Sequence, residues 1–242
     1  MPAQKEPMRP KLPFAIAAFC LFLAPAYAQE VIMTQPSADT APKGRVFARA
    51  DGFYTQAPSF YQENLNLAVG LAGNFELSLN ASNAFNRAPM VGSLVAGFKY
   101  VPYKGRHLRV YVGDQFIQPL TNKSSAGFSQ GNISYEALAL SVGSFRFTCG
   151  SFQSHDGVAL GNRAGAIGGI EWMARTFENG WSIMPSIDYA SGAGTNGYVS
   201  PGLMFAKGNF FACPGYMIAN PHNMNGAQQS FLMVGYTFGP LR

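Results

Sequence analysis

The 242-residue sequence predicts an all-β fold, an antiparallel transmembrane β-barrel of about twelve strands. Three observations point to this fold. Windows of about ten residues recur along the chain in which apolar side chains alternate with small or polar ones, as the geometry of a strand requires. Charged residues make up only 12% of the chain, against about 25% in soluble proteins. Short connections between the windows alternate with long ones.

The first residues predict a secretory signal. A few basic residues precede an apolar run over residues 14–26, which is too short to span a bilayer. The run leads into Ala26-Tyr27-Ala28, which has small residues at the spacing of a cleavage site. We therefore expect a signal peptide over residues 1–28, a flexible N-terminal lead-in over residues 29–42 and the barrel over residues 43–242.

The strands are predicted from period-two alternation. Residues 65–82, LNLAVGLAGNFELSLNAS, show it best, because Leu65, Leu67 and Val69 alternate with smaller or polar residues, and the pattern resumes after Ala-Gly-Asn. Two strands joined by a tight turn account for this segment. The twelve expected strands cover residues 45–55, 61–71, 74–83, 92–101, 107–117, 132–142, 145–152, 164–175, 181–190, 198–206, 209–218 and 228–238.

The connections favour a membrane barrel over a soluble sheet protein. Tight turns are expected at residues 72–74, 143–144 and 178–180, and the last of these contains Asn-Gly, the strongest short hairpin signal. Between them lie longer links such as residues 119–132. Short periplasmic turns and longer external loops are the arrangement of outer-membrane barrels, and an even strand count puts both chain ends on the periplasmic side.

The apolar parity of the strands is predicted to face lipid. A tilted strand needs only about ten residues to cross the hydrocarbon, and closing the sheet removes edges that lipid cannot satisfy. Aromatic residues near strand ends are typical of the girdles at the two interfaces. These aromatic residues are Tyr100, Trp172, Trp181, Tyr189, Tyr198, Phe210, Tyr216, Tyr236 and Phe238.

The last strand carries a family resemblance. SFLMVGYTF, residues 230–238, resembles the alternating, Phe-ending C-terminal strand of bacterial outer-membrane β-barrel proteins, although four residues follow the Phe. The hairpin VGLAGNFELSLN, residues 69–80, is similar to a segment of transporter-type barrels of aromatic-compound pathways. The resemblance implies the bacterial outer membrane as location, outer-membrane lipid as surroundings and the barrel-assembly machinery as a partner.

The opposite parity then faces a lumen and carries charges of both signs. Such side chains form a constriction that selects small solutes by charge and size, or a packed ion-pair network that fills a narrow barrel. We expect passive passage for an unknown small solute through a charged lumen, with no cofactor and no metal. The candidate lumen-lining residues are Glu76, Lys99, Arg109, Arg146, Glu171, Arg175 and Asp188.

Three other functions stay open. A structural or adhesive outer-membrane barrel would use its external loops to bind partners. A secreted soluble β-sandwich explains the signal and the strands, but not the low charge or the alternating connections. An outer-membrane hydrolase would need His155 and His222, in two predicted loops, to act with Ser151 or Ser154. We expect no enzyme, because no catalytic motif accompanies these residues.

Composition excludes some partners and leaves one question about the cysteines. The excess of basic over acidic residues is mild, so nucleic acid is not an expected partner. After the signal, only Cys149 and Cys213 remain, and the sequence cannot establish whether they pair.

Overall fold

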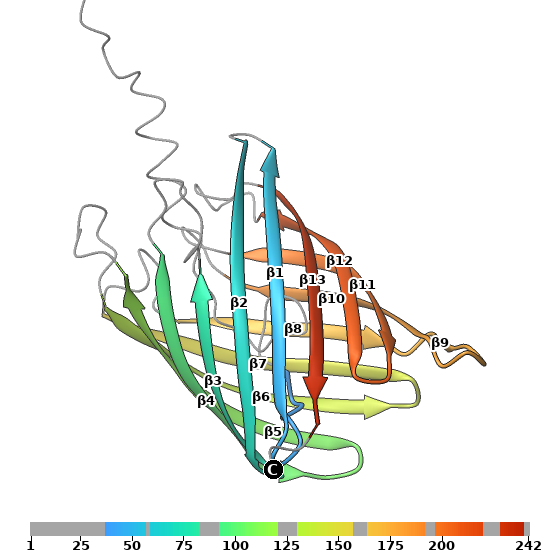
Figure 1. Ribbon diagram of the computed structural model, residues 1–242. Coiled ribbons are helices and arrows are strands. Elements are labelled where there is room, and N and C mark those ends of the chain that lie inside the picture. Colours follow the sequence, from blue (N-terminus) through green and yellow to red (C-terminus); the bar gives the residue numbers. More distant parts are fainter. Residues whose placement is uncertain are drawn as a thin grey trace, which may run out of the picture.

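The protein is a closed, antiparallel β-barrel (Figure 1). The computed structural model describes residues 37–56, 59–82, 92–120, 130–156, 164–191, 197–219 and 228–239. The strands are β1 (Val46–Gln56), β2 (Ser59–Ala72), β3 (Phe75–Ser82), β4 (Ser93–Lys104), β5 (Leu108–Pro119), β6 (Gly131–Val142), β7 (Phe145–Asp156), β8 (Ala164–Trp172), β9 (Arg175–Thr176), β10 (Ser182–Ala190), β11 (Tyr198–Lys207), β12 (Phe210–Ala219) and β13 (Gln229–Phe238). Among these residues, no helix is long and apolar enough to span a membrane.

Each strand pairs with its neighbour in the chain, and β1 pairs with β13 to close the ring. β8 and β9 both pair with β10, at Ile187↔Ile170 and Ile183↔Arg175, so they occupy one position in the wall. The thirteen strands of the described chain therefore fill twelve positions, as predicted. The expected strand over residues 164–175 is the one that the structure breaks.

The connections divide the barrel into two ends. The hairpins β2–β3, β4–β5, β6–β7 and β11–β12 turn at the end where the C-terminus is marked in Figure 1. Gly143 and Gly208, with φ of 58° and 59°, supply the left-handed conformation that two of these tight turns need. The links at the other end are long, apart from the two residues between β1 and β2. The predicted alternation of short turns and long loops is thus confirmed, with one exception.

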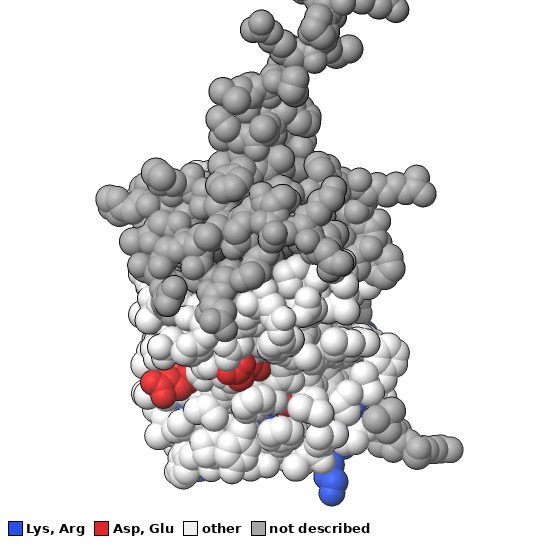
Figure 2. All heavy atoms as spheres, turned by 90° about the vertical axis from the view of Figure 1, so that its left-hand side faces the viewer, with Lys and Arg blue, Asp and Glu red and all other residues white. Residues whose placement is uncertain are grey.

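The apolar parity faces outward. Leu67 is 48% exposed and its neighbour Asn66 only 5%, and Leu79 is 48% exposed while Asn80 is 2%. A soluble β-sandwich would bury these leucines, so that alternative is wrong. Figure 2 shows one side of the wall, where uncharged residues dominate and the few acidic groups lie at mid-height. The fold and its outward apolar belt are those of bacterial outer-membrane barrels, and we assign the protein to that membrane.

Aromatic rings cluster on the wall near the short-turn end. Phe145 stacks on Trp172, with ring centroids 5.8 Å apart, and Tyr236 contacts Phe238 at 5.0 Å. Tyr198 departs from the expected girdle, because it shares its parity with Ser200 and is 5% exposed on the inner face. The predicted girdle is therefore present at this end, whereas Tyr189, Tyr198 and Tyr216 lie toward the other end.

The inner face is less polar than the sequence analysis assumed. One apolar cluster lies on β1 and β11–β13 and contains Phe53, Phe231 and Met233. A second lies on β4–β8 and contains Tyr111 and Tyr135. Polar and charged side chains occupy the remaining inner surface, with most of the charged ones near the short-turn end.

Candidate functional site

Six of the seven predicted lumen residues lie on the inner face. They are Glu76, Lys99, Arg109, Arg146, Glu171 and Asp188. Glu76, Arg109 and Arg146 are each the second residue of a strand that follows a short turn, and Glu171 is next to last in β8. Period-two alternation and hairpin geometry thus gather five of these charges near one end of the barrel, whereas Asp188 lies two residues from the opposite end of β10.

Arg175 lies apart from the other six. Its side chain is exposed and its guanidinium lies 4.7 Å from the centre of the Phe177 ring. Regular strand pairing stops at Trp172 and resumes at Arg175, so residues 173–174 interrupt the parity. Figure 1 shows β9 in a hairpin that projects from the barrel.

Glu76 and Lys99 form a buried cross-strand pair. They are register partners on β3 and β4, and Lys99 Nζ lies 2.8 Å from Glu76 Oε1. Their side chains are 4% and 1% exposed. The backbone N–H of Ala41 also donates a hydrogen bond to Glu76. A pair so thoroughly enclosed belongs to the framework of the site.

Arg146 and Glu171 form a second cross-strand pair. They are register partners on β7 and β8, and the guanidinium donates two hydrogen bonds to the carboxylate, one of them 2.6 Å long from Nη2 to Oε1. The Glu171 side chain is 4% exposed and that of Arg146 is 20% exposed. This bidentate geometry fixes the Arg146 guanidinium at the inner surface.

Residues 37–45 cross the inside of the barrel before β1 begins. Ala38 is 2% exposed within the cluster that contains Tyr111, and Thr40 Oγ1 donates to the Gly73 carbonyl over 3.4 Å. Residues 37–42, part of the flexible lead-in expected over residues 29–42, lie against the inner wall. The only signal in this stretch was Asp39, an isolated charge among polar and apolar residues.

Asp39 lies between two arginines. Its carboxylate accepts hydrogen bonds from Arg109 on β5 and from Arg146 on β7, through different oxygens. Partial desolvation among the surrounding strands raises the pKa of the Asp39 carboxyl, but the Arg146 and Arg109 guanidiniums outweigh this effect and hold the pKa below its usual value of 3.8. Asp39 is therefore ionised at neutral pH.

A polar network covers the inner face of β1–β3. Arg49 Nε lies 2.8 Å from Asp51 Oδ1, and Asn66 Nδ2 donates to Asp51 Oδ2 over 2.9 Å. Asn80 donates in turn to Asn66, and Ser82 Oγ donates to Asn80 over 3.0 Å. Arg49 and Asp51 are not among the predicted lumen residues, although their alternation with Ala48, Ala50 and Gly52 indicates one shared face of the strand.

A cavity of about 280 Å³ opens among these groups. Asp39, Arg49, Lys99, Arg146 and Glu171 supply charge on part of its surface. Larger apolar side chains form another part, namely Phe47, Met184, Met204 and Phe211, and the remaining surface includes Glu76 and three hydroxyl side chains. The Asp39 side chain is 54% exposed although strands surround it, so water reaches it inside the barrel. This cavity is the candidate functional site.

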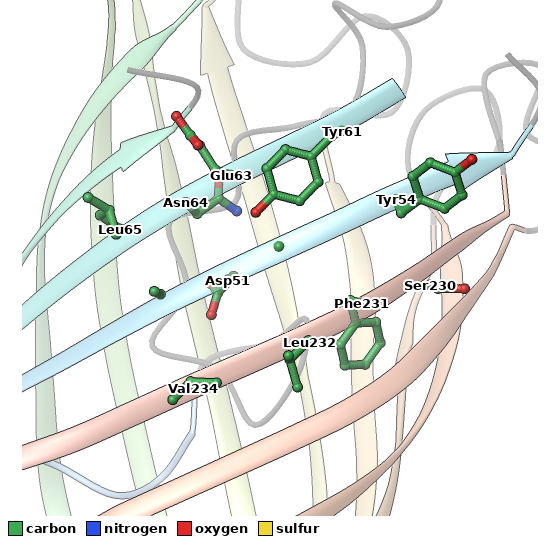
Figure 3. A pocket seen from close by; sticks show the side chains of 12 residues that line it. Asp51, Tyr54, Tyr61, Glu63, Asn64, Leu65, Ser230, Phe231, Leu232 and Val234 are labelled. Atoms are coloured by element: carbon green, nitrogen blue, oxygen red, sulfur yellow. The ribbon is translucent and has the colours of Figure 1, made fainter. Parts of the chain in front are cut away.

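A larger hollow of about 610 Å³ lies on the wall formed by β13, β1 and β2 (Figure 3). Its floor includes Ala50 and Gly52, and Tyr54, Tyr61 and Leu65 surround it. These side chains belong to the outward parity, where the surroundings are hydrocarbon. Lipid fills a depression of this kind, so it is not the candidate site.

The proposed catalytic side chains do not converge. Ser154 is 4% exposed on the inner face of β7, whereas Ser151 and His155 lie exposed on the outer face. Ser151 donates to Glu136 over 3.2 Å. His222 and the loops of the adhesive alternative lie outside the described residues. Within the described chain, no cluster of His, Cys, Asp and Glu could hold a metal ion.

The cysteines are both free. Cys149 is exposed on the outer face, and Cys213 is buried on the inner one. The wall of the barrel therefore separates their thiols.

The comparisons with solved structures support the fold. The KdgM porin aligns over 81% of this chain and 99% of its own, with a TM-score of 0.55 and 14% identity. The structure of the KdgM porin in complex with disordered oligogalacturonate aligns over 81% of this chain and 98% of its own, with a TM-score of 0.54 and 13% identity. LpxR from Salmonella typhimurium aligns over 80% of this chain and 99% of its own, with 8% identity. Its TM-score of 0.41 is too low to support a conclusion about this protein. No family model and no curated protein matches the chain.

Proposed function

We propose that the barrel provides passive passage for a small solute through its charged lumen. The observation that carries this proposal is the cavity at the short-turn end, in which charged groups inside a closed barrel are open to water. Asp39 and Arg146 line this cavity, and their side chains are 54% and 20% exposed. A barrel packed solid with side chains would leave such groups dry. The resemblance to a porin fold supports the same function.

The charges of the described inner face nearly balance. Near balance predicts conduction with weak ion selectivity, because no single sign of charge dominates the local potential. The cationic groups are Arg49, Lys99, Arg109 and Arg146, and the anionic groups are Asp39, Asp51, Glu76, Glu171 and Asp188.

A liposome-swelling assay tests this function. Purified protein in liposomes should admit glucose faster than sucrose, because the inner face narrows the barrel. Galacturonate is included because the KdgM porin was solved with oligogalacturonate. Swelling no faster than in protein-free liposomes for all three solutes would contradict passage and would favour the structural or adhesive barrel.

The orientation and processing of the chain form part of this proposal. The short-turn end faces the periplasm, and the barrel-assembly machinery recognises the last strand, β13. Residues 1–28 are removed, so that the mature chain begins at Gln29. The intact mass of protein purified from outer membranes tests the processing, and a mass that includes residues 1–28 would contradict it.

A further inference from the structure

Two arginines, of which Arg146 lines the cavity, hold a carboxylate that does not belong to the wall. Arg109 and Arg146 come from β5 and β7, and Asp39 reaches them from the segment that precedes β1. We propose that this pair is a binding site for the carboxylate of a solute, and that Asp39 occupies the site while the channel is at rest. The inference rests on the proposed passage and names the solute class for it: a small monocarboxylic acid with an apolar body.

The contacts of Asp39 are suited to exchange. Its side chain is 54% exposed, and those of Arg109 and Arg146 are 30% and 20% exposed. Ion pairs that water reaches are weak, because solvent competes for both partners. The Glu76–Lys99 pair nearby, at 4% and 1% exposure, has no such access. A solute carboxylate can therefore replace Asp39 without opening the framework of the site.

The other end of the segment is anchored to the wall. Gly44 N donates to the Gly70 carbonyl over 2.8 Å, and Gly70 N donates to the Arg45 carbonyl over 3.2 Å. A Cβ atom at Gly70 would overlap the carbonyl oxygens of Ala41 and Pro42, so the close approach requires glycine. The Asp39 side chain can leave the arginines while this anchor and the buried Ala38 keep the segment against the wall.

Charge sets the number of carboxylates that the site accepts. Arg146 keeps its bidentate partner Glu171 when Asp39 leaves, so the pair of arginines and Glu171 together carry one positive charge. Among the described residues, the ion pairs of Arg109 involve Asp39 alone. One carboxylate therefore restores neutrality, and a second would be left without a partner.

The apolar side of the cavity selects the rest of the solute. Phe47 stacks on Phe211 with ring centroids 5.9 Å apart, and Met184 and Met204 complete this surface. Burying apolar or aromatic area against these side chains is favourable. A purely polar acid gains only the ion pair, so benzoate should bind better than acetate.

Benzoate binding in detergent, measured by calorimetry, tests the inference. Asp39→Asn should bind benzoate about three- to tenfold more tightly than the wild type. In the wild type the Asp39 carboxylate competes for the arginines, and the apparent affinity falls in proportion to the fraction of molecules in which the site is vacant. Adding Arg109→Gln should abolish that gain. Benzyl alcohol, which lacks the carboxylate, should bind both proteins alike. Asp114→Asn is the matched control, since Asp114 lies on the outer parity of β5 and binds Asn132 and Ser134.

Bilayer recordings of the same variants separate the two proposals. Equal benzoate affinity in the wild type and Asp39→Asn, or a gain in Asp114→Asn as well, would overturn the carboxylate site even if all variants conduct. Tighter binding by Asp39→Asn without conductance in any variant would overturn the passage and leave the site standing. A heat-modifiability gel confirms that each variant is folded.

Discussion

Arg109 and Arg146 share the inner face, but their partners differ in burial. Glu171, the partner of Arg146, is 4% exposed, whereas Asp39 is 54% exposed. Arg146→Gln should therefore leave a buried carboxylate without its charged partner and cost about 1–3 kcal/mol of stability. Arg109→Gln should cost about 0–1 kcal/mol, as exposed pairs do. Urea unfolding in detergent measures both, and equal losses would contradict the assignment of framework and exchangeable pairs.

The inward position of the charged residues on strands was predictable from the sequence, but the position of Asp39 was not. Glu76, Lys99 and Glu171 follow from parity, since each alternates with apolar neighbours. Asp39 gains its partners from β5 and β7, which are 70 and 107 residues further along the chain. No local pattern encodes such contacts, so only the folded chain reveals that an internal carboxylate occupies the arginine pair.

The strands themselves are the most predictable elements. Leu79 faces lipid and is 48% exposed, while its neighbour Ser78 is half-buried on the inner face of β3. Leu79→Arg should cost about 2–4 kcal/mol and reduce assembly, because arginine near the middle of the membrane is poorly tolerated. Ser78→Arg should assemble better, and heat-modifiability on gels compares the two. Equal behaviour would contradict the two faces of the wall.

The break between β8 and β9 was not predictable, for a physical reason. Residues 164–175 keep an alternating composition up to Arg175, so the pattern alone continues the strand. In the structure, Met173 N donates to the Ser144 carbonyl, where the contact with β7 ends. Ala174 N donates to the Ile183 carbonyl, and pairing with β10 continues in a register shifted by one residue. The end of β8 is determined by its pairing with both β7 and β10. The sequence of β8 alone does not determine that pairing.

The segment over residues 37–45 should respond to acid. When Asp39 is bound to Arg109 and Arg146, the pKa of its carboxyl is lowered. The contact is therefore fully stabilised above the usual pKa of 3.8, and it is lost as the pH falls through the lowered pKa. The groups that face this carboxylate are Arg109 and Arg146, and Glu171 lies beside them. A spin label at Ser37→Cys, with the native cysteines replaced, should gain mobility when the pH is lowered from neutral to well below 3.8.

Asp39→Asn supplies the control for that measurement. Without the ionisable group, the label should be mobile at both pH values. A pH response of the same size in Asp39→Asn would show that another group controls the segment.

At the scale of the whole molecule, the barrel joins an apolar outer wall to an inner face of mixed character. The twelve wall positions follow from alternation and from the count of connections, both of which are local. The inner apolar clusters were missed, because Tyr111 and Phe231 sit at positions that a parity argument reserves for polar residues. A barrel with few inward charges must fill part of its inner face with such side chains.

The central claim is that water lies inside this wall and lipid outside it. Cysteines on β10 test it directly, because Met184 lines the inner cavity and Ile187, 41% exposed, faces outward. Met184→Cys and Ile187→Cys, each in a background without the native cysteines, are reconstituted in liposomes and treated with a membrane-impermeant thiol reagent. We predict that Met184→Cys reacts and Ile187→Cys does not. Reaction at neither position would show a filled lumen, and equal reaction at both would show that the wall is not embedded in lipid.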